Sequence, residues 1–303
     1  MNNLLDVKAL SRSKDLPFVA KTLAQGFLHG SHASVQRGVG IEFSQYRAYE
    51  PGDELAKVDW KLFGRTDKYF VREAERESDT NLWFAIDSSA SMAHVNQAYK
   101  NEVGALSKLY FAKILSATMG YIAQQQGDNV GCLALSSVQP VFLPLMSGYK
   151  HWQRLLLSLN KIKAGEHFPH YQHVYAQLQT MRSSGIVFLF SDFYQTHDEI
   201  YQLIKQLNHK DLEVIAVQLE ANDEVEFDFD DVVRFQDLES QDEYLLSPKV
   251  AKKSYMENRG LFNQQLQVFL QKNGLTHWRI NIDLPIDEIL HQFIQERQRV
   301  IMK

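Results

Sequence analysis

Two short apolar runs, each followed by an aspartate, constrain the fold of this chain most strongly. Residues 82–86 lead into Asp87, and residues 186–190 lead through a serine into Asp192. Uninterrupted apolar runs of this length are typical of strands that are covered on both faces in a parallel sheet. We therefore expect both aspartates at the carboxyl ends of buried strands, which is where open α/β sheets bind ligands.

The segments around these runs alternate between helical and strand patterns. Apolar residues at three- and four-residue steps predict a long helix over 97–126, and two strand patterns over 129–135 and 138–145 predict a hairpin. Prolines in its second arm place that arm at the sheet edge. Further helices are expected over 151–159, 171–182, 198–207, 247–273 and 286–299, and further strands over 213–219 and 276–281. This alternation predicts an α/β, Rossmann-like fold, with a mostly parallel sheet and helices on both faces.

Residues 1–80 have a different character from residues 81–303. Asp15 is placed to cap a helix that ends at Gly30, and alternating patterns around Pro51-Gly52-Asp53 predict a small β-rich lobe. We therefore divide the chain into an N-terminal helix and lobe over 1–80 and a sheet domain over 81–303. The charged residues of the lobe are either solvated at a hairpin surface or form a contact surface for a partner, and they include Arg47, Asp53, Asp59 and Arg65.

Composition excludes several classes of protein. With 303 residues, 45% of them hydrophobic and 23% charged, the chain is long and apolar enough for a large globular core. A net charge of -5 gives no long-range attraction for nucleic acid. Cys132 is the only cysteine, which fits a reducing compartment, and no apolar run reaches the length of a membrane span. Asp6 and Lys8 interrupt the apolar core that a signal peptide needs, so we expect a cytoplasmic protein.

The residues after the first strand favour a metal site. Asp87, Ser89 and Ser91 lie on alternate positions, and their oxygens can turn toward one point in a tight loop. Oxygen ligands of this kind suit Mg²⁺, with Mn²⁺ or Ca²⁺ as alternatives. If the two strands are neighbours, Asp192 adds a second carboxylate. The alternative is that these residues are ordinary caps and turn residues, but the matching positions of the two aspartates favour the metal.

One long segment resembles a known family. Residues 38–73, which begin G-V-G-I-E-F-S-Q-Y-R-A-Y-E-P-G-D, are followed by D-S-S-A-S-M and together resemble the bacterial family called domain of unknown function 58. The resemblance implies a von Willebrand factor A-like fold and a metal-ion-dependent adhesion site at the D-x-S-x-S motif. It also implies a MoxR-type AAA+ ATPase as partner, and protein clients on which the pair acts.

The loop between the two strands departs from the pattern that the resemblance implies. Proteins of the von Willebrand type usually supply a threonine there, but residues 163–173 read K-A-G-E-H-F-P-H-Y-Q-H. Glu166 or His167 is placed to take its position. His167, His170 and His173 have the spacing of a transition-metal cluster, but Pro169 argues against one helical face, so we favour a solvated loop.

Most enzyme classes lack their motifs in this sequence. A haloacid-dehalogenase-like phosphatase needs a carboxylate where Ser89 stands, and neither a G-x-S-x-G elbow nor a G-x-x-x-x-G-K-[ST] loop is present. We therefore interpret the chain as a non-enzymatic protein-binding module. The alternative is a metal-assisted, phosphatase-like hydrolase that uses Asp87 and Asp192, although no general base is evident. The acidic stretch over 221–231 is expected to be a solvated connection, with a contact for a basic partner as the alternative.

Overall fold

The computed structural model divides the chain into two compact units. It describes residues 15–35, 45–48, 62, 64–65, 68–73, 80–99, 105–137, 141–165, 167–181, 185–194, 198–207, 212–227, 233–236, 243–246, 248–284, 286, 288–289 and 292. The larger unit spans residues 1–28 and 80–303, and the smaller unit spans residues 29–79.

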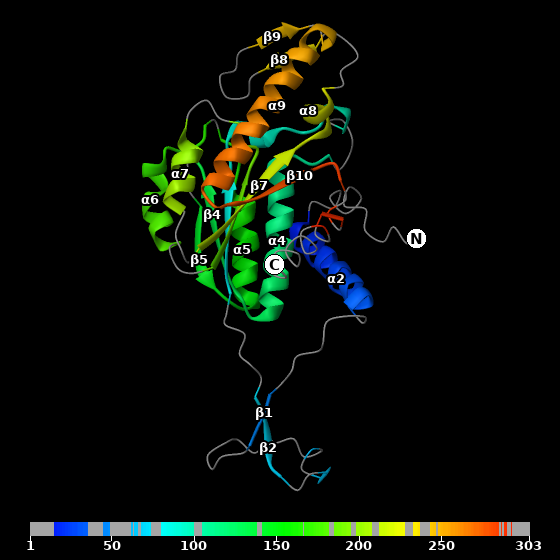
Figure 1. Cartoon of the computed structure of the whole chain (residues 1–303), viewed down its shortest axis with the longest axis vertical. Helices are drawn as coiled ribbons and strands as arrows, with labels where there is room; N and C mark the ends of the chain where they lie inside the picture. The colour runs from blue at the N-terminus through cyan, green and yellow to red at the C-terminus, as the bar shows by residue number, and fades with distance from the viewer. Residues whose placement is uncertain are drawn as a thin grey trace. The chain divides into compact units, whose positions relative to one another are not determined.

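A six-stranded sheet forms the centre of the larger unit (Figure 1). Its strands are β3 (Asn81–Asp87), β4 (Asn129–Leu135), β5 (Phe142–Met146), β6 (Gly185–Ser191), β7 (Leu212–Glu220) and β10 (Thr276–Asn281). They lie in the order β10-β7-β6-β3-β4-β5, and each neighbouring pair is parallel except β4 and β5. Numbered along the chain, this is the 3-2-1-4-5-6 order of doubly wound α/β folds. The predicted α/β class and the predicted antiparallel edge arm are confirmed.

Helices cover both faces of the sheet, as the sequence predicted. Because side chains alternate along a strand, Phe84 and Ile86 enter one apolar cluster while Trp83 and Ala85 enter the other. The first cluster includes buried residues of α2 (Leu16–Val35), α4 (Lys108–Gln126) and α5 (Tyr149–Lys161). The second includes buried residues of α6 (Tyr171–Thr180), α7 (Glu199–Leu207) and α9 (Pro248–Lys272). Burial on both faces explains why the strand sequences read as continuous apolar runs.

The N-terminal helix belongs in part to the sheet unit. Asp15 caps it, since the Phe18 amide donates to Asp15 Oδ1 over 3.2 Å, and Leu16 and Leu23 are buried in the first apolar cluster. The helix continues past the expected end at Gly30 to Val35. Our division at residue 80 groups this helix with the lobe, whereas the structure groups residues through 28 with the sheet.

The described residues of the smaller unit include one antiparallel pair of strands. They are β1 (Gln45–Ala48) and β2 (Phe70–Glu73), with Gln45 opposite Glu73 and Ala48 opposite Phe70. Both strands fall within the alternating patterns of the sequence. Asp53 and Asp59, on the segment between the strands, lie outside the described residues.

The prediction of one long helix over 97–126 is wrong for its first third. Gln97–Tyr99 forms only a 3-10 turn, η3, and α4 begins at Lys108. Ser107 is the N-cap residue, because its side chain accepts a hydrogen bond from the Tyr110 amide over 3.1 Å. Ser107 also pairs with Val95 in an isolated β-bridge, which holds the chain extended just before the helix.

The acidic stretch after β7 is not a solvated connection over its first residues, so that expectation is corrected. Asn222–Glu226 forms the short helix α8, and Asp223 within it is buried. Further on, β8 (Val233–Gln236) and β9 (Glu243–Leu246) form an antiparallel pair that the sequence did not predict. Of the predicted C-terminal helix, the described residues 286, 288, 289 and 292 are helical. No helix in the described parts of the chain is both long enough and apolar enough to cross a membrane.

Candidate functional site

The two predicted aspartates meet at the topological switch point of the sheet. Strands β3 and β6 are parallel neighbours, and Asp87 ends the first while Asp192 directly follows the second. After these two strands the chain turns to opposite faces of the sheet, and doubly wound folds bind their ligands at such a point. Both carboxylates are fully buried.

Hydrogen bonds from both strands fix the Asp87 carboxylate. The Ser89 amide donates to Asp87 Oδ1 over 2.8 Å, and the Ser191 hydroxyl donates to Asp87 Oδ2 over 2.6 Å. Burial and the nearby charge of Asp192 outweigh these hydrogen bonds and raise the pKa of Asp87 to about 7. The carboxyl group is therefore poised to gain or lose a proton near neutral pH.

A chain of hydroxyl groups joins the D-x-S-x-S motif to Asp192. Ser89 Oγ lies 3.1 Å from Ser91 Oγ, and the Ser91 hydroxyl donates to Asp192 Oδ1 over 3.2 Å. Ser91 lies on η2 (Ala90–Ala93), the 3-10 turn that follows the motif's first serine. The structure thus brings together all four residues that the sequence singled out first.

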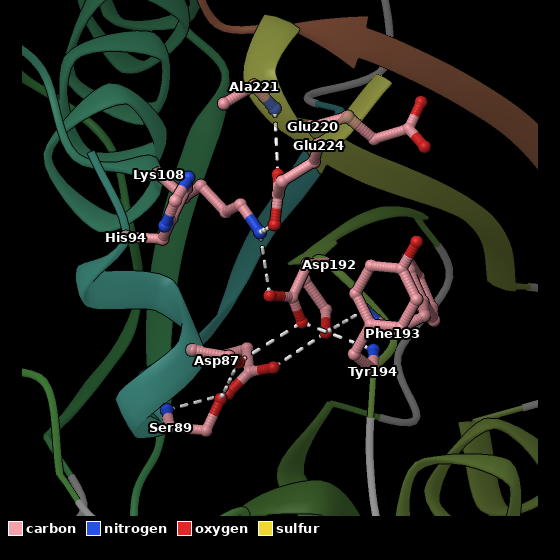
Figure 2. A network of polar contacts seen from close by, with 12 residues as sticks. Asp87, Ser89, His94, Lys108, Asp192, Phe193, Tyr194, Glu220, Ala221 and Glu224 are labelled. Carbon is pink, nitrogen blue, oxygen red and sulfur yellow. Dashed lines mark hydrogen bonds and ion pairs between the residues drawn. The ribbon is translucent and has the colours of Figure 1, made fainter. Parts of the chain in front are cut away.

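Lys108 is the site residue that sequence reasoning missed. Its ammonium group lies 2.9 Å from Asp192 Oδ2 and 2.6 Å from Glu224 Oε1, between the two carboxylates (Figure 2). The side chain is fully buried at the start of α4. Burial disfavours its charge, but the attraction of Asp192 and Glu224 is stronger and raises the pKa of Lys108 above its usual value. A permanent cation therefore neutralises part of the charge of the site.

The loop after β6 has an unusual backbone that positions Asp192. Phe193 has a φ of 62°, in the left-handed region that a bulky residue seldom adopts, and its amide donates to Ser191 Oγ over 2.9 Å. The next amide, of Tyr194, donates to Asp192 Oδ1 over 3.2 Å, and the Tyr194 ring lies 5.9 Å from the ammonium of Lys108. Strained residues of this kind cluster at functional sites.

Carboxylates that follow β7 and β10 in the chain brace the loops around the site. His94 Nε2 and Asp223 Oδ1 lie 3.1 Å apart, while Asp283 accepts hydrogen bonds from the Asn96 side chain over 2.7 Å and from the Asn222 amide over 2.8 Å. On α8, Glu224 Oε2 also accepts from the Ala221 amide over 2.9 Å (Figure 2). These contacts tie the segment after the motif to the ends of two more strands.

The structure describes the other predicted site residues only in part. Glu166 lies outside the described residues, although the neighbouring Gly165 amide donates to the Ser88 carbonyl over 2.6 Å. His167, His170 and His173 are all exposed, and the described residues contain no group of three or more His, Cys, Asp or Glu side chains suited to a metal. Arg65 is exposed in the smaller unit, and the side chain of Arg47 lies outside the description.

The donor set of the site fits a hard divalent cation in part. The hydroxyls of Ser89 and Ser91 and the carboxylate of Asp192 form one chain of hydrogen bonds, and the carboxylate of Asp87 accepts from the backbone amide of Ser89 at the start of this chain. Carboxylate and hydroxyl oxygens are the ligands that Mg²⁺ prefers. One oxygen, Asp192 Oδ2, is already bound to the ammonium of Lys108. The remaining oxygens could hold such a cation with water completing its coordination.

Comparison with known proteins adds a family and several relatives. Residues 45–259 match the model of a family described as protein of unknown function DUF58. The chain is 25% identical over 191 residues to the uncharacterized protein Rv1480 of Mycobacterium tuberculosis, which covers 62% of this chain and 58% of that protein. It is also 25% identical over 132 residues to the uncharacterized protein YeaD of Bacillus subtilis, covering 44% of this chain and 27% of that protein. The chain thus spans less than two thirds of the length of these relatives.

Two solved structures are also similar. The protein BatB from Bacteroides thetaiotaomicron aligns over 73% of this chain and 99% of its own, with a TM-score of 0.44 and 11% identity. The SpRpn10 VWA domain aligns over 71% of this chain and 95% of its own, with a TM-score of 0.39 and 12% identity.

Proposed function

Because this chain belongs to the DUF58 family, we propose that it is a non-enzymatic protein-binding module that recognises its partner through a divalent cation. The family resemblance seen in the sequence is confirmed by the match. The observation that carries the proposal is the meeting of Asp87, Ser89, Ser91 and Asp192 at the switch point of the sheet. The proposed cation is Mg²⁺, with Mn²⁺ or Ca²⁺ as alternatives.

The residues of such a site would have different roles. The hydroxyls of Ser89 and Ser91 and the Oδ1 atom of Asp192 would hold the cation, either directly or through water. Asp87 accepts hydrogen bonds from the Ser89 amide and the Ser191 hydroxyl and so keeps the motif loop in place, and in its ionised form it adds negative charge. When bound, the cation offers a coordination position for a carboxylate of the partner, and this makes recognition specific for an acidic residue.

The proposed partner is a MoxR-type AAA+ ATPase, with which the chain would act in the assembly or activation of client proteins in the cytoplasm. Support for this partner comes from the family resemblance of residues 38–73 and the D-S-S-A-S-M motif. The cation site is the proposed contact for this partner, and Arg47, Asp53, Asp59 and Arg65 of the smaller unit are a separate set of proposed contacts. The net charge of -5 gives nucleic acid no role in this proposal.

Capture of the ATPase by the tagged full chain tests the proposal. We expect capture in Mg²⁺, loss of capture in excess EDTA, and recovery when Mg²⁺ is returned. Asp87→Ala and Ser89→Ala should each reduce capture at least about tenfold, because losing one ligand or its support typically costs that much in metal affinity. Asp198→Ala is the matched control, since Asp198 is an exposed carboxylate before α7 and touches none of the site residues. If Asp87→Ala and EDTA both leave capture unchanged, the cation-dependent mechanism is wrong.

A metal-assisted hydrolase is the second candidate, and one observation favours it. A carboxyl group with a pKa of about 7, as Asp87 has, can donate or accept a proton at neutral pH. However, both oxygens of Asp87 are engaged by Ser89 and Ser191, and the group is fully buried. A panel of phosphate esters with Mg²⁺ or Mn²⁺ distinguishes the candidates: phosphate release that Asp87→Asn abolishes would favour the hydrolase.

A further inference from the structure

Lys108 occupies an unfavourable position unless it has a specific role. It is the first residue of α4, where the helix dipole repels positive charge, and its side chain is fully buried. A buried ammonium is costly unless it is paired. Here Asp192 and Glu224 provide the pairing, and the Tyr194 ring lies nearby.

The ammonium contacts the same carboxylate that the proposed cation needs. Asp192 Oδ2 binds Lys108 over 2.9 Å, while Asp192 Oδ1 faces the hydroxyl of Ser91 over 3.2 Å. A divalent cation held at Oδ1 would therefore lie close to a positive charge in a buried setting, where repulsion between like charges is strong.

We propose that Lys108 is a tethered cation that competes with the divalent ion for Asp192 and so sets a low metal affinity for the site. The inference rests on the proposed function, because it takes the divalent ion as the ligand of the site. In the absence of metal, Lys108 holds Asp192 in place. When metal binds, the ammonium group moves away from Asp192.

Glu224 makes this exchange physically feasible. It lies 2.6 Å from the ammonium on the side away from the motif, so Lys108 remains paired when Asp192 turns to the metal (Figure 2). Glu224 is itself held through its second oxygen by the Ala221 amide. A lysine with Asp192 as its only partner would be left as an unpaired buried charge, and metal binding would then be far less favourable.

Calorimetric titration of the chelator-treated full chain with MnCl₂ and MgCl₂ tests the proposal. Lys108→Met should bind Mn²⁺ at least about tenfold more tightly than the wild type, because the competing charge is removed. Lys108→Arg keeps the positive charge, so this variant should bind Mn²⁺ as weakly as the wild type does. Lys113→Met is the matched control: Lys113 is a half-buried lysine on the same helix, α4, but it donates to the Ile162 carbonyl and not to a carboxylate. It should bind as the wild type does.

Glu224→Gln provides a test of opposite sign that keeps Lys108 in place and serves even if Lys108→Met does not fold. Without the second carboxylate, Asp192 is the one ion-pair partner left to the ammonium among the described residues, so Mn²⁺ affinity should fall at least about threefold. Equal Mn²⁺ affinity in the wild type and Lys108→Met, no Mn²⁺ binding by folded Lys108→Met, or unchanged affinity in Glu224→Gln would each overturn the competition. A different result would overturn the proposed function, namely capture of the ATPase by the wild type that EDTA does not reduce.

Discussion

The hydroxyl of Ser191 donates a hydrogen bond of 2.6 Å to Asp87, across two neighbouring strands whose residues are 104 positions apart in the chain. This bond joins the two halves of the candidate site directly. It also means that the last residue of β6 supports the last residue of β3, and that neither strand end can move independently of the other.

Replacing Ser191 by alanine should therefore destabilise the protein. We expect Ser191→Ala to lower the free energy of unfolding by about 1–3 kcal/mol, because a buried carboxylate loses a hydrogen-bond donor. Ser116→Ala is the control: Ser116 is equally buried, but its hydroxyl has no hydrogen-bond partner among the described residues. That change should be neutral or slightly stabilising. Urea unfolding of both variants checks the difference, and equal effects would mean that the Ser191–Asp87 bond contributes nothing.

The Asp87 carboxyl should make a contribution to stability that is lost as the pH rises from about 4 to about 7. The pKa of Asp87 is raised from 3.8 to about 7 in the folded protein, by burial and then by the charge of Asp192. In this window the unfolded chain has lost the Asp87 proton while the folded chain keeps it, so rising pH favours unfolding by a few kcal/mol in total.

Asp87→Asn isolates this contribution because an amide does not titrate. The variant should show a flatter stability profile between pH 4 and pH 7 than the wild type when unfolding is followed by denaturant titration at each pH. Asp198→Asn, at an exposed carboxylate, should keep the profile of the wild type. A wild-type profile in Asp87→Asn would show that another group is responsible.

Gly185 should tolerate no larger residue, because it lies where β6 starts beside β3. Its φ is 152°, and a Cβ atom there would lie 2.3 Å from the Asn81 carbonyl oxygen. We expect Gly185→Ala to lower the free energy of unfolding by about 1–3 kcal/mol, since two strands of the sheet would have to move apart. Gly260→Ala on α9 has open space and should stabilise the protein by about 0.5–1 kcal/mol. Thermal unfolding of the two variants checks the opposite signs.

The strands of the site could be predicted from the sequence because burial on both faces leaves a clear pattern. The apolar runs before Asp87 and Asp192 required a parallel sheet, and the structure places the two strands side by side. That these two strands are neighbours does not follow from the sequence, since no residue pattern states which strands pair. The start of α4 was misplaced because apolar residues at helical spacing, such as Val103 and Leu106, continue upstream of the Ser107 cap.

Lys108 and Glu224 could not be recognised because each is typical of a solvent-exposed position. A lysine in a helical pattern and a glutamate in an acidic stretch both suggest solvated side chains. Lys108 and Glu224 are 116 positions apart in the sequence, and only the fold brings them together beside Asp192. The spacing of Ala221 and Glu224 at the start of α8 was the one available signal, because a glutamate at this position often accepts a hydrogen bond from the backbone amide of the residue just before the helix.

The two hydrogen bonds that Asp283 accepts have a consequence for how this site could vary among related chains. A single carboxylate that follows β10 holds both Asn96, which follows the motif, and Asn222, which begins α8. Exchanging that carboxylate for an amide would loosen the motif loop and the helix carrying Glu224 at once, without altering any oxygen of the proposed cation site. A change at position 283 could thus alter the affinity of the proposed site for a cation while the D-S-S-A-S sequence stays the same.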